Sequence, residues 1–138
     1  MICTFIDAGV LIAAARGTGS GAEQALRILK DNNREFASSI FLKLEVLPKA
    51  IYNQRIIEVE FYQAYFDAVT HWATNIEQII HAAYEESAQS GLGAMDALHI
   101  AAAVSVRAVE FVTYEKLEKS IYRTKSIKVV SIRPEQLG

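Results

Sequence analysis

The chain has 138 residues, with 14 basic and 16 acidic side chains and a formal net charge of −2. Its 51% hydrophobic content, 22% charged content and only 2 prolines exclude a disordered or fibrous protein, and the length suits one domain over residues 1–138. Because no apolar run approaches the ~18 to 20 residues that span a bilayer, and no basic stretch follows Met1, we expect a soluble cytoplasmic protein without a membrane partner.

Short β-type runs and helical patterns alternate along the chain. Runs rich in β-branched and aromatic residues predict strands, whereas apolar residues that recur every three and four positions predict helices. In chain order we predict a strand over 2–7, helices over 10–17 and 22–33, a strand over 35–39, helices over 40–52, 56–72, 76–90 and 91–104, a strand over 110–113, a short helix over 115–121 and a strand over 127–132. Strands connected through helices are typical of parallel sheets, so we expect an α/β sandwich with a small central parallel sheet.

Several local features refine these elements. Cys3 has no second cysteine to pair with, so we expect it to be a buried strand residue. Serines that close the 35–39 strand can cap the following helix, in which Pro48 removes a backbone donor and should introduce a kink. The aromatic residues between 61 and 72 recur at helical spacing, which favours a place in the core or in a dimer face over base stacking.

Four acidic residues stand out by their positions, either at the ends of predicted elements or inside an apolar stretch. Asp7 ends the first strand, and Glu115 follows the 110–113 strand, so both should emerge at the carboxyl edge of the sheet, where sites form in open α/β folds. Asp96 lies in the first turn of a helix, where the dipole favours an ionised carboxylate. Glu45 is surrounded by apolar residues in "IFLKLEVL", where a charge is costly unless it is compensated.

These four carboxylates would repel one another if they shared a pocket, and a divalent cation would relieve that repulsion. Oxygen ligands select Mg²⁺ or Mn²⁺ over softer metals. Each residue also has an ordinary structural interpretation, as a helix cap, a turn residue, an exposed helix-start residue or a side chain that reaches solvent. Their joint occurrence is what favours a metal site.

The stretches "FIDAGVLIAA", "LEVLPKA", "MDALHIAAA" and "FVTYEKLEK", in this order, resemble the motifs of PIN-domain proteins, the fold of VapC-type toxin ribonucleases. The resemblance covers essentially the whole chain and implies a PIN-like three-layer α/β/α sandwich. It also implies a Mg²⁺ or Mn²⁺ site formed by Asp7, Glu45, Asp96 and Glu115. These residues would serve the hydrolysis of RNA phosphodiester bonds by an activated water. A cognate antitoxin and a homodimer are further implications of the resemblance.

Two departures from the family pattern leave an alternative open. Ala8-Gly9 stands where the family often has a hydroxyl or amide residue, and the fourth acid is Glu115 instead of the commoner Asp, with Glu118 as a substitute candidate. A catalytically weak or inactive PIN module that binds RNA or a protein therefore remains the alternative. A phosphatase or phospho-acceptor domain with Asp7 as nucleophile is a third hypothesis, which needs a partner lysine such as Lys116.

The distribution of charge points to where RNA could bind. Residues 116–133 carry six basic side chains and one acidic one, a pattern that suits phosphate binding but equally suits a solvated surface. The candidates for RNA binding are Lys116, Lys119 and Arg123. His99 lies one helical turn after Asp96, where it could orient a ligand or belong to the core. "GTGSGA" follows a helical segment, so it does not meet the context of a dinucleotide-binding turn.

Overall fold

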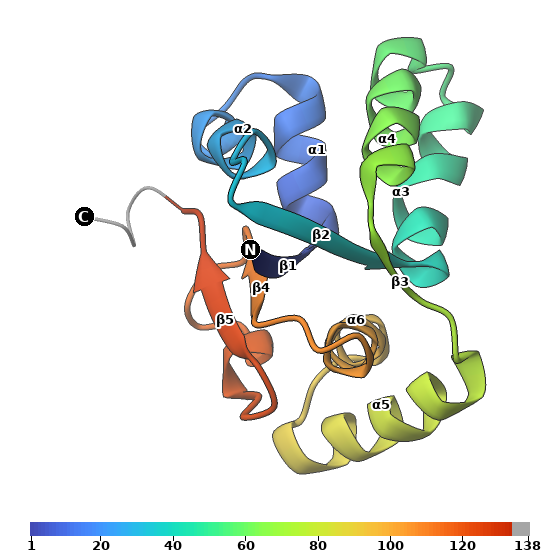
Figure 1. Cartoon of the computed structure of the whole chain (residues 1–138), viewed down its shortest axis with the longest axis vertical. Coiled ribbons are helices and arrows are strands. Elements are labelled where there is room, and N and C mark those ends of the chain that lie inside the picture. The colour runs from blue at the N-terminus through green and yellow to red at the C-terminus, as the bar shows by residue number, and fades with distance from the viewer. Residues whose placement is uncertain (134–138) are drawn as a thin grey trace.

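The computed structural model describes residues 1–133 and contains one five-stranded parallel sheet with helices on both faces (Figure 1). The strand order is β3-β2-β1-β4-β5, and every neighbouring pair is parallel. The strands are β1 (Ile2–Ile6), β2 (Arg34–Ser39), β3 (His71–Ala73), β4 (Glu110–Thr113) and β5 (Lys128–Ser131). The predicted α/β sandwich with a small parallel sheet is confirmed.

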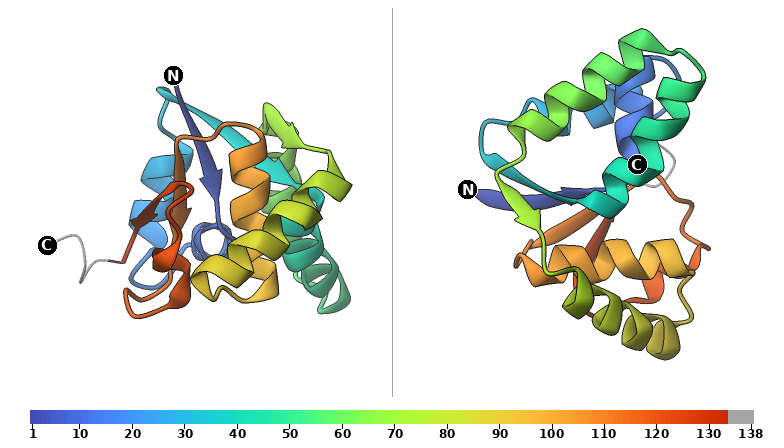
Figure 2. Two further views of the ribbon diagram at one scale, coloured as in Figure 1. Left: turned by 90° about the horizontal axis from the view of Figure 1, so that it is seen from below. Right: turned by 90° about the vertical axis from the view of Figure 1, so that its right-hand side faces the viewer.

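Six α-helices and one 3-10 helix connect the strands. They are α1 (Ala8–Arg16), α2 (Ala22–Leu29), α3 (Ile40–Tyr52), α4 (Ile56–Ala68), α5 (Ile76–Ser90), α6 (Ala94–Ser105) and η1 (Ser120–Arg123). Helices α1 to α4 lie on one side of the sheet, whereas α6 and then α5 lie on the other, with α6 between the sheet and α5 (Figures 1 and 2). None of these helices has the length and apolar character needed to cross a bilayer.

Successive side chains of the central strands point to opposite faces of the sheet, and each face has its own apolar core. Ile6 of β1 and Val112 of β4 belong to the cluster that packs against α1, α3 and α4. Their neighbours Phe5 and Phe111 face the opposite way and stack on each other, with ring centroids 5.5 Å apart, against the alanines of α6. Because successive residues in a strand point to opposite faces, an almost uninterrupted apolar strand is what a sheet covered on both sides requires.

Local signals explain where several helices begin and end. Ser39 caps α3, its Oγ accepting from the backbone N of Leu42 at 3.4 Å, as predicted from the serines at the end of β2. Asn75 caps α5 in the same way, and Gly91 ends that helix in the left-handed conformation that glycine adopts without strain. Pro48 lies inside α3, and the helix continues through it to Tyr52.

Two predicted helices end earlier in the structure than expected. The predicted 56–72 helix stops at Ala68, and residues 71–73 form the short edge strand β3. The helix predicted over 22–33 stops at Leu29, since Asp31 forms a turn by accepting from the backbone N of Asn33. Cys3 lies in a strand as expected but is only partly buried.

The helix predicted over 115–121 is also wrong. The backbone N of Glu115 donates to Thr113 Oγ1 at 3.1 Å, and the Glu115 carbonyl accepts from Tyr122 Oη at 2.6 Å. These bonds connect the segment after β4 to the end of that strand and to the 3-10 helix. A 3-10 turn over Ser120–Arg123 is what remains of the predicted helix.

Candidate metal centre

The candidate site lies at the carboxyl ends of the two central strands. From β1 the chain continues outward to β2 and β3 on one side, while β4 and β5 lie on the other side of β1. The strand order therefore reverses between β1 and β4, and in open parallel sheets ligands bind in the crevice formed at such a reversal. Asp7 follows β1 directly, and Glu115 follows β4 by two residues.

Asp7 is fixed by hydrogen bonds to both carboxylate oxygens. It is the N-cap of α1, where Oδ1 accepts from the backbone N of Ala8 at 2.7 Å, and Oδ2 accepts from Thr113 Oγ1 at 2.8 Å. Only 7% of the residue is exposed. Burial raises the pKa of Asp7 to about 6, although His99 and both hydrogen bonds lower it, and the nearby Asp96 raises it further. A buried carboxylate with a raised pKa is a group that a bound cation would stabilise in its charged form.

Thr113 connects the two strand ends. Its hydroxyl donates to Asp7 and accepts from the backbone N of Glu115, so one side chain orients one predicted ligand and the backbone of another. Ala8-Gly9, directly after Asp7, offers no side-chain hydroxyl or amide, whereas Thr113 donates a hydroxyl to Asp7 from the neighbouring strand. The sequence analysis did not single out Thr113. The available signal was a hydroxyl residue that ends a buried strand two positions before a candidate acid.

Glu45 reaches the site from α3 and is held by His99. Its Oε1 lies 2.8 Å from His99 Nε2, and because an ionised carboxylate can only accept, Nε2 must carry the proton. His99 is fully buried, whereas the Glu45 side chain is 34% exposed. The compensation that Glu45 was expected to need on its apolar helix therefore comes from an imidazole of α6.

Asp96 lies near the start of α6, the third residue after the N-cap Gly93. Burial raises its pKa, and the negative charges of Glu115 and Glu45 raise it further, while His99 opposes them. The residues that act on Asp96 are thus two of the other predicted ligands. Together with the effect of Asp96 on Asp7, these interactions couple Asp96 to each of the other three predicted acids.

The donor set fits a hard divalent cation. Ligand atoms of Asp7, Glu45 and His99 lie within 4.8 Å of one another; Asp96 and Glu115 lie outside this group, and Asp96 interacts electrostatically with Asp7, Glu45 and Glu115. Their mutual repulsion and burial disfavour the ionised forms of Asp7 and Asp96, which a cation would reverse. Since His99 Nε2 is already bound to Glu45, the histidine is better suited to orienting Glu45 than to binding a metal itself.

Tyr114, between Thr113 and Glu115, packs closely against Gly9 of α1 and Gly21, the residue before α2. A Cβ atom added at Gly21 would come within 2.8 Å of its ring, and one at Gly9 within 3.3 Å of its own Cβ. The guanidinium of Arg133 stacks over the ring at 4.5 Å and donates to the Tyr114 carbonyl at 2.8 Å. Because successive residues point to opposite sides of an extended chain, a fixed Tyr114 helps to set the direction of its two neighbours.

Solved structures provide the comparison. The sequence matches no protein-family model and no curated protein. VapBC2 from Rickettsia felis, bound to a DNA fragment from its promoter, matches with a TM-score of 0.70 and 14% identity, covering 94% of this chain and 98% of that one. A toxin-antitoxin complex from Klebsiella pneumoniae matches with a TM-score of 0.68 and 19% identity, covering 94% of this chain and 97% of that one. DNA-bound VapBC from Salmonella typhimurium matches with a TM-score of 0.68 and 16% identity, covering 96% of this chain and 99% of that one.

The chain has a PIN-like fold. The sequence-based resemblance to PIN-domain proteins is confirmed at the level of the fold.

Within this PIN-like fold, the predicted RNA-binding residues are not part of the acidic cluster. Lys116 and Lys119 are exposed on the segment after β4, and Arg123 belongs to η1, where it lines a separate pocket with Lys125. Among residues 1–133, no hydrogen bond or ion pair joins Lys116 to Asp7, so the phosphatase hypothesis gains no support. Of the two candidates for the fourth acid, Glu115 acts on Asp96, whereas Glu118 is exposed.

Two sequence features have structural roles outside the candidate metal centre. Gly17 ends α1 in a left-handed conformation, so "GTGSGA" follows a helix, as expected, and not a strand. Tyr62, Tyr65 and Phe66 are buried in the core against α1 and α3, which confirms their structural interpretation over base stacking.

Proposed function

We propose that this protein is a metal-dependent endoribonuclease and the toxin of a type II toxin-antitoxin pair. The observation that carries the proposal is the group formed by Asp7, Glu45 and His99, whose ligand atoms lie within 4.8 Å of one another, with Asp96 coupled electrostatically to Asp7, Glu45 and Glu115. The similarity to two VapBC structures and one toxin-antitoxin complex over nearly the whole chain supports it.

In this proposal, each residue of the site has a distinct task. Asp7 and Asp96 would bind Mg²⁺ or Mn²⁺ directly, Glu45 would bind it in the orientation set by His99, and Glu115 would complete the site at its outer side. The cation would supply activation of a water molecule and neutralisation of the scissile phosphate. No side-chain nucleophile is then required, in keeping with an Asp7 whose two oxygens both accept hydrogen bonds.

The decisive experiment is RNA cleavage by the purified protein with Mg²⁺ or Mn²⁺. We expect cleavage by the wild type and none by Asp7→Asn or Asp96→Asn, with circular dichroism showing that both variants remain folded. Asp67→Asn, on the exposed side of α4, is the matched control and should cleave like the wild type. Unchanged cleavage by Asp7→Asn would refute the proposed mechanism.

The alternative, a non-catalytic PIN module, predicts a different result in the same preparation. A nuclease should be stabilised against thermal unfolding by Mn²⁺ in a manner that depends on Asp7. A module without catalysis should show neither this stabilisation nor cleavage. Thr113 supports the catalytic proposal because its hydroxyl orients Asp7, although Ala8-Gly9 offers no side-chain donor.

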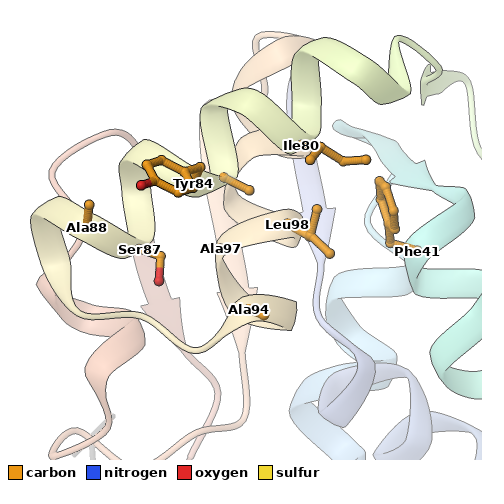
Figure 3. A pocket seen from close by; sticks show the side chains of 9 residues that line it. Phe41, Ile80, Tyr84, Ser87, Ala88, Ala94, Ala97 and Leu98 are labelled. Atoms are coloured by element: carbon orange, nitrogen blue, oxygen red, sulfur yellow. The ribbon is translucent and has the colours of Figure 1, made fainter.

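The proposed partners are an antitoxin and a second copy of the chain. The antitoxin would lay a peptide across the acidic crevice and insert a basic side chain, and a small reading frame beside the gene would identify it. For the homodimer, the chain offers an apolar groove of about 670 Å³ between α5, α6 and the start of α3 (Figure 3). Ile80 and Tyr84 on its α5 side are 52% and 77% exposed, as expected for residues that a second copy covers.

A further inference from the structure

A second groove adjoins the metal centre on the side of α1, α3 and α4. It encloses about 160 Å³, and its lining includes Glu45, which also belongs to the acidic cluster. Its other charged lining residues are Arg16, Lys49, Arg55 and Glu58. The groove therefore shares Glu45 with the candidate metal centre, and its α3 lining extends from Glu45 to Asn53 just beyond the helix.

Positive charge exceeds negative charge along this groove beyond Glu45. Arg16 Nε donates to Glu58 Oε1 at 2.9 Å, and Arg55 lies 3.6 Å from the same oxygen, so two guanidinium groups share one carboxylate. Glu58 is only 14% exposed, whereas half of each arginine side chain is exposed. Since a guanidinium carries five N–H donors, both arginines retain donors for a further anion.

Lys49 occupies the position nearest the acidic cluster. It follows Glu45 by four residues on α3, one helical turn or about 6 Å along the axis. Glu45 is bound to His99 instead of Lys49, and no ion pair of Lys49 occurs among residues 1–133. An exposed ammonium group beside a candidate catalytic centre is thus available to an anionic ligand.

We propose that this groove binds the phosphate backbone of the RNA on one side of the scissile bond, with Lys49 next to the bond and Arg16 and Arg55 beyond it. This inference rests on the proposed ribonuclease function and adds a binding track that the predicted residues Lys116, Lys119 and Arg123 do not include. Phosphate contacts position a strand without reading its sequence, so the track contributes affinity and register. The carboxylates cannot fulfil this task, because they repel the backbone.

Binding can be measured separately from cleavage. A fluorescein-labelled single-stranded RNA ten-mer is titrated with the protein in EDTA, and anisotropy gives Kd at several salt concentrations. Lys49→Gln should weaken binding about 5- to 10-fold at low salt and reduce the salt slope by about 1, as expected for the loss of one phosphate contact. Lys49→Arg, which keeps the charge, should bind nearly as the wild type. Lys30→Gln, an exposed lysine after α2, is the matched control and should not change Kd.

Kinetics with Mn²⁺ distinguish a binding residue from a catalytic one. Lys49→Gln should raise KM and leave kcat unchanged. Wild-type cleavage combined with equal Kd values for Lys49→Gln and the wild type would overturn the groove assignment and leave the ribonuclease proposal standing. A loss of binding in Lys30→Gln as large as in Lys49→Gln would also overturn it, since general charge would then explain the effect. Absence of cleavage by the wild type would instead refute the proposed function.

An acidic protein segment is the competing occupant. If Lys49→Gln weakened the binding of an oligoglutamate peptide while RNA affinity stayed constant, the groove would bind a protein partner and the RNA assignment would be wrong.

Discussion

Replacing Asp7 with asparagine should make the metal-free protein more stable at neutral pH, although it removes a proposed ligand. Asp7 is 7% exposed, and its pKa is raised from 3.8 to about 6, chiefly by burial. At pH values between 3.8 and about 6, Asp7 therefore keeps a proton in the folded state that it has already released in the unfolded state. The free energy of unfolding falls as pH rises through this window and stays at the lower level above it.

The size of the effect follows from the shift. A change of about 2 pKa units corresponds to about 3 kcal/mol, the free energy by which ionised Asp7 destabilises the metal-free fold at pH 7. Asparagine carries no charge, and its Oδ1 can still accept from the backbone N of Ala8. Its amide can donate to Thr113 Oγ1, whose hydroxyl can rotate. The free energy of unfolding of Asp7→Asn should then exceed that of the wild type by up to about 3 kcal/mol at pH 7. At pH 4.5 this difference should be smaller by about 2 kcal/mol.

Urea unfolding in EDTA at both pH values measures this difference. The exposed Asp67→Asn variant is the control, and its difference from the wild type should not change with pH. Mn²⁺ at about 100 times its Kd should then add about 2.7 kcal/mol to the wild type and far less to Asp7→Asn. Stability and activity are therefore expected to move in opposite directions at this residue.

Two results would refute the reasoning. If Asp7→Asn were no more stable than the wild type at pH 7, the charge of Asp7 would not be costly to bury. If the gap between the two proteins were the same at both pH values, the gain would come from something other than ionisation. In either case, compensation by a cation would lose its physical basis.

Three further predictions test the supporting residues. Thr113→Val should lower the cleavage rate about tenfold with the fold retained in circular dichroism, because Asp7 loses one of its two donors; an unchanged rate would contradict this role. His99→Phe should weaken Mn²⁺ binding about 10- to 100-fold in a thermal-shift titration, since Glu45 loses the group that orients it; equal affinity would exclude that function. Ile80→Glu should convert a dimer to a monomer in light scattering, with Glu77→Gln as the control on the same helix, whereas a monomeric wild type would disprove the homodimer.

Strong local patterns made most of the fold predictable. The limits of α3, α5 and β4 agree with the prediction, because capping residues such as Ser39 and Asn75 and the glycine at 91 mark them in the sequence. The strand β3 was not predictable in the same way. It has three residues, and the helical spacing of Tyr65, Phe66 and Val69 continues up to it, so only pairing with β2 makes it a strand.

The candidate site was predictable where residue type and position coincide. Acids after β1 and β4 emerge at the same edge once the strands are parallel neighbours, and Thr113 connects the two positions by bonding both the Asp7 carboxylate and the backbone N of Glu115. The contact between Glu45 and His99 joins residues 54 positions apart on two helices, and it depends on how α3 and α6 pack. The groove with Lys49 depends on how α3 packs against α1 and α4, which explains why the basic C-terminal segment was the more visible candidate for RNA binding.

The anchoring of Tyr114 has a consequence for natural variation. Gly9 and Gly21 touch no proposed ligand, yet a methyl group at either position would press on Tyr114 and tilt the strand end that carries Thr113 and Glu115. Substitutions at these two glycines would therefore disturb the candidate site without replacing any of its acids. Selection against the proposed activity has a route through these two small residues that an inventory of candidate ligands would overlook.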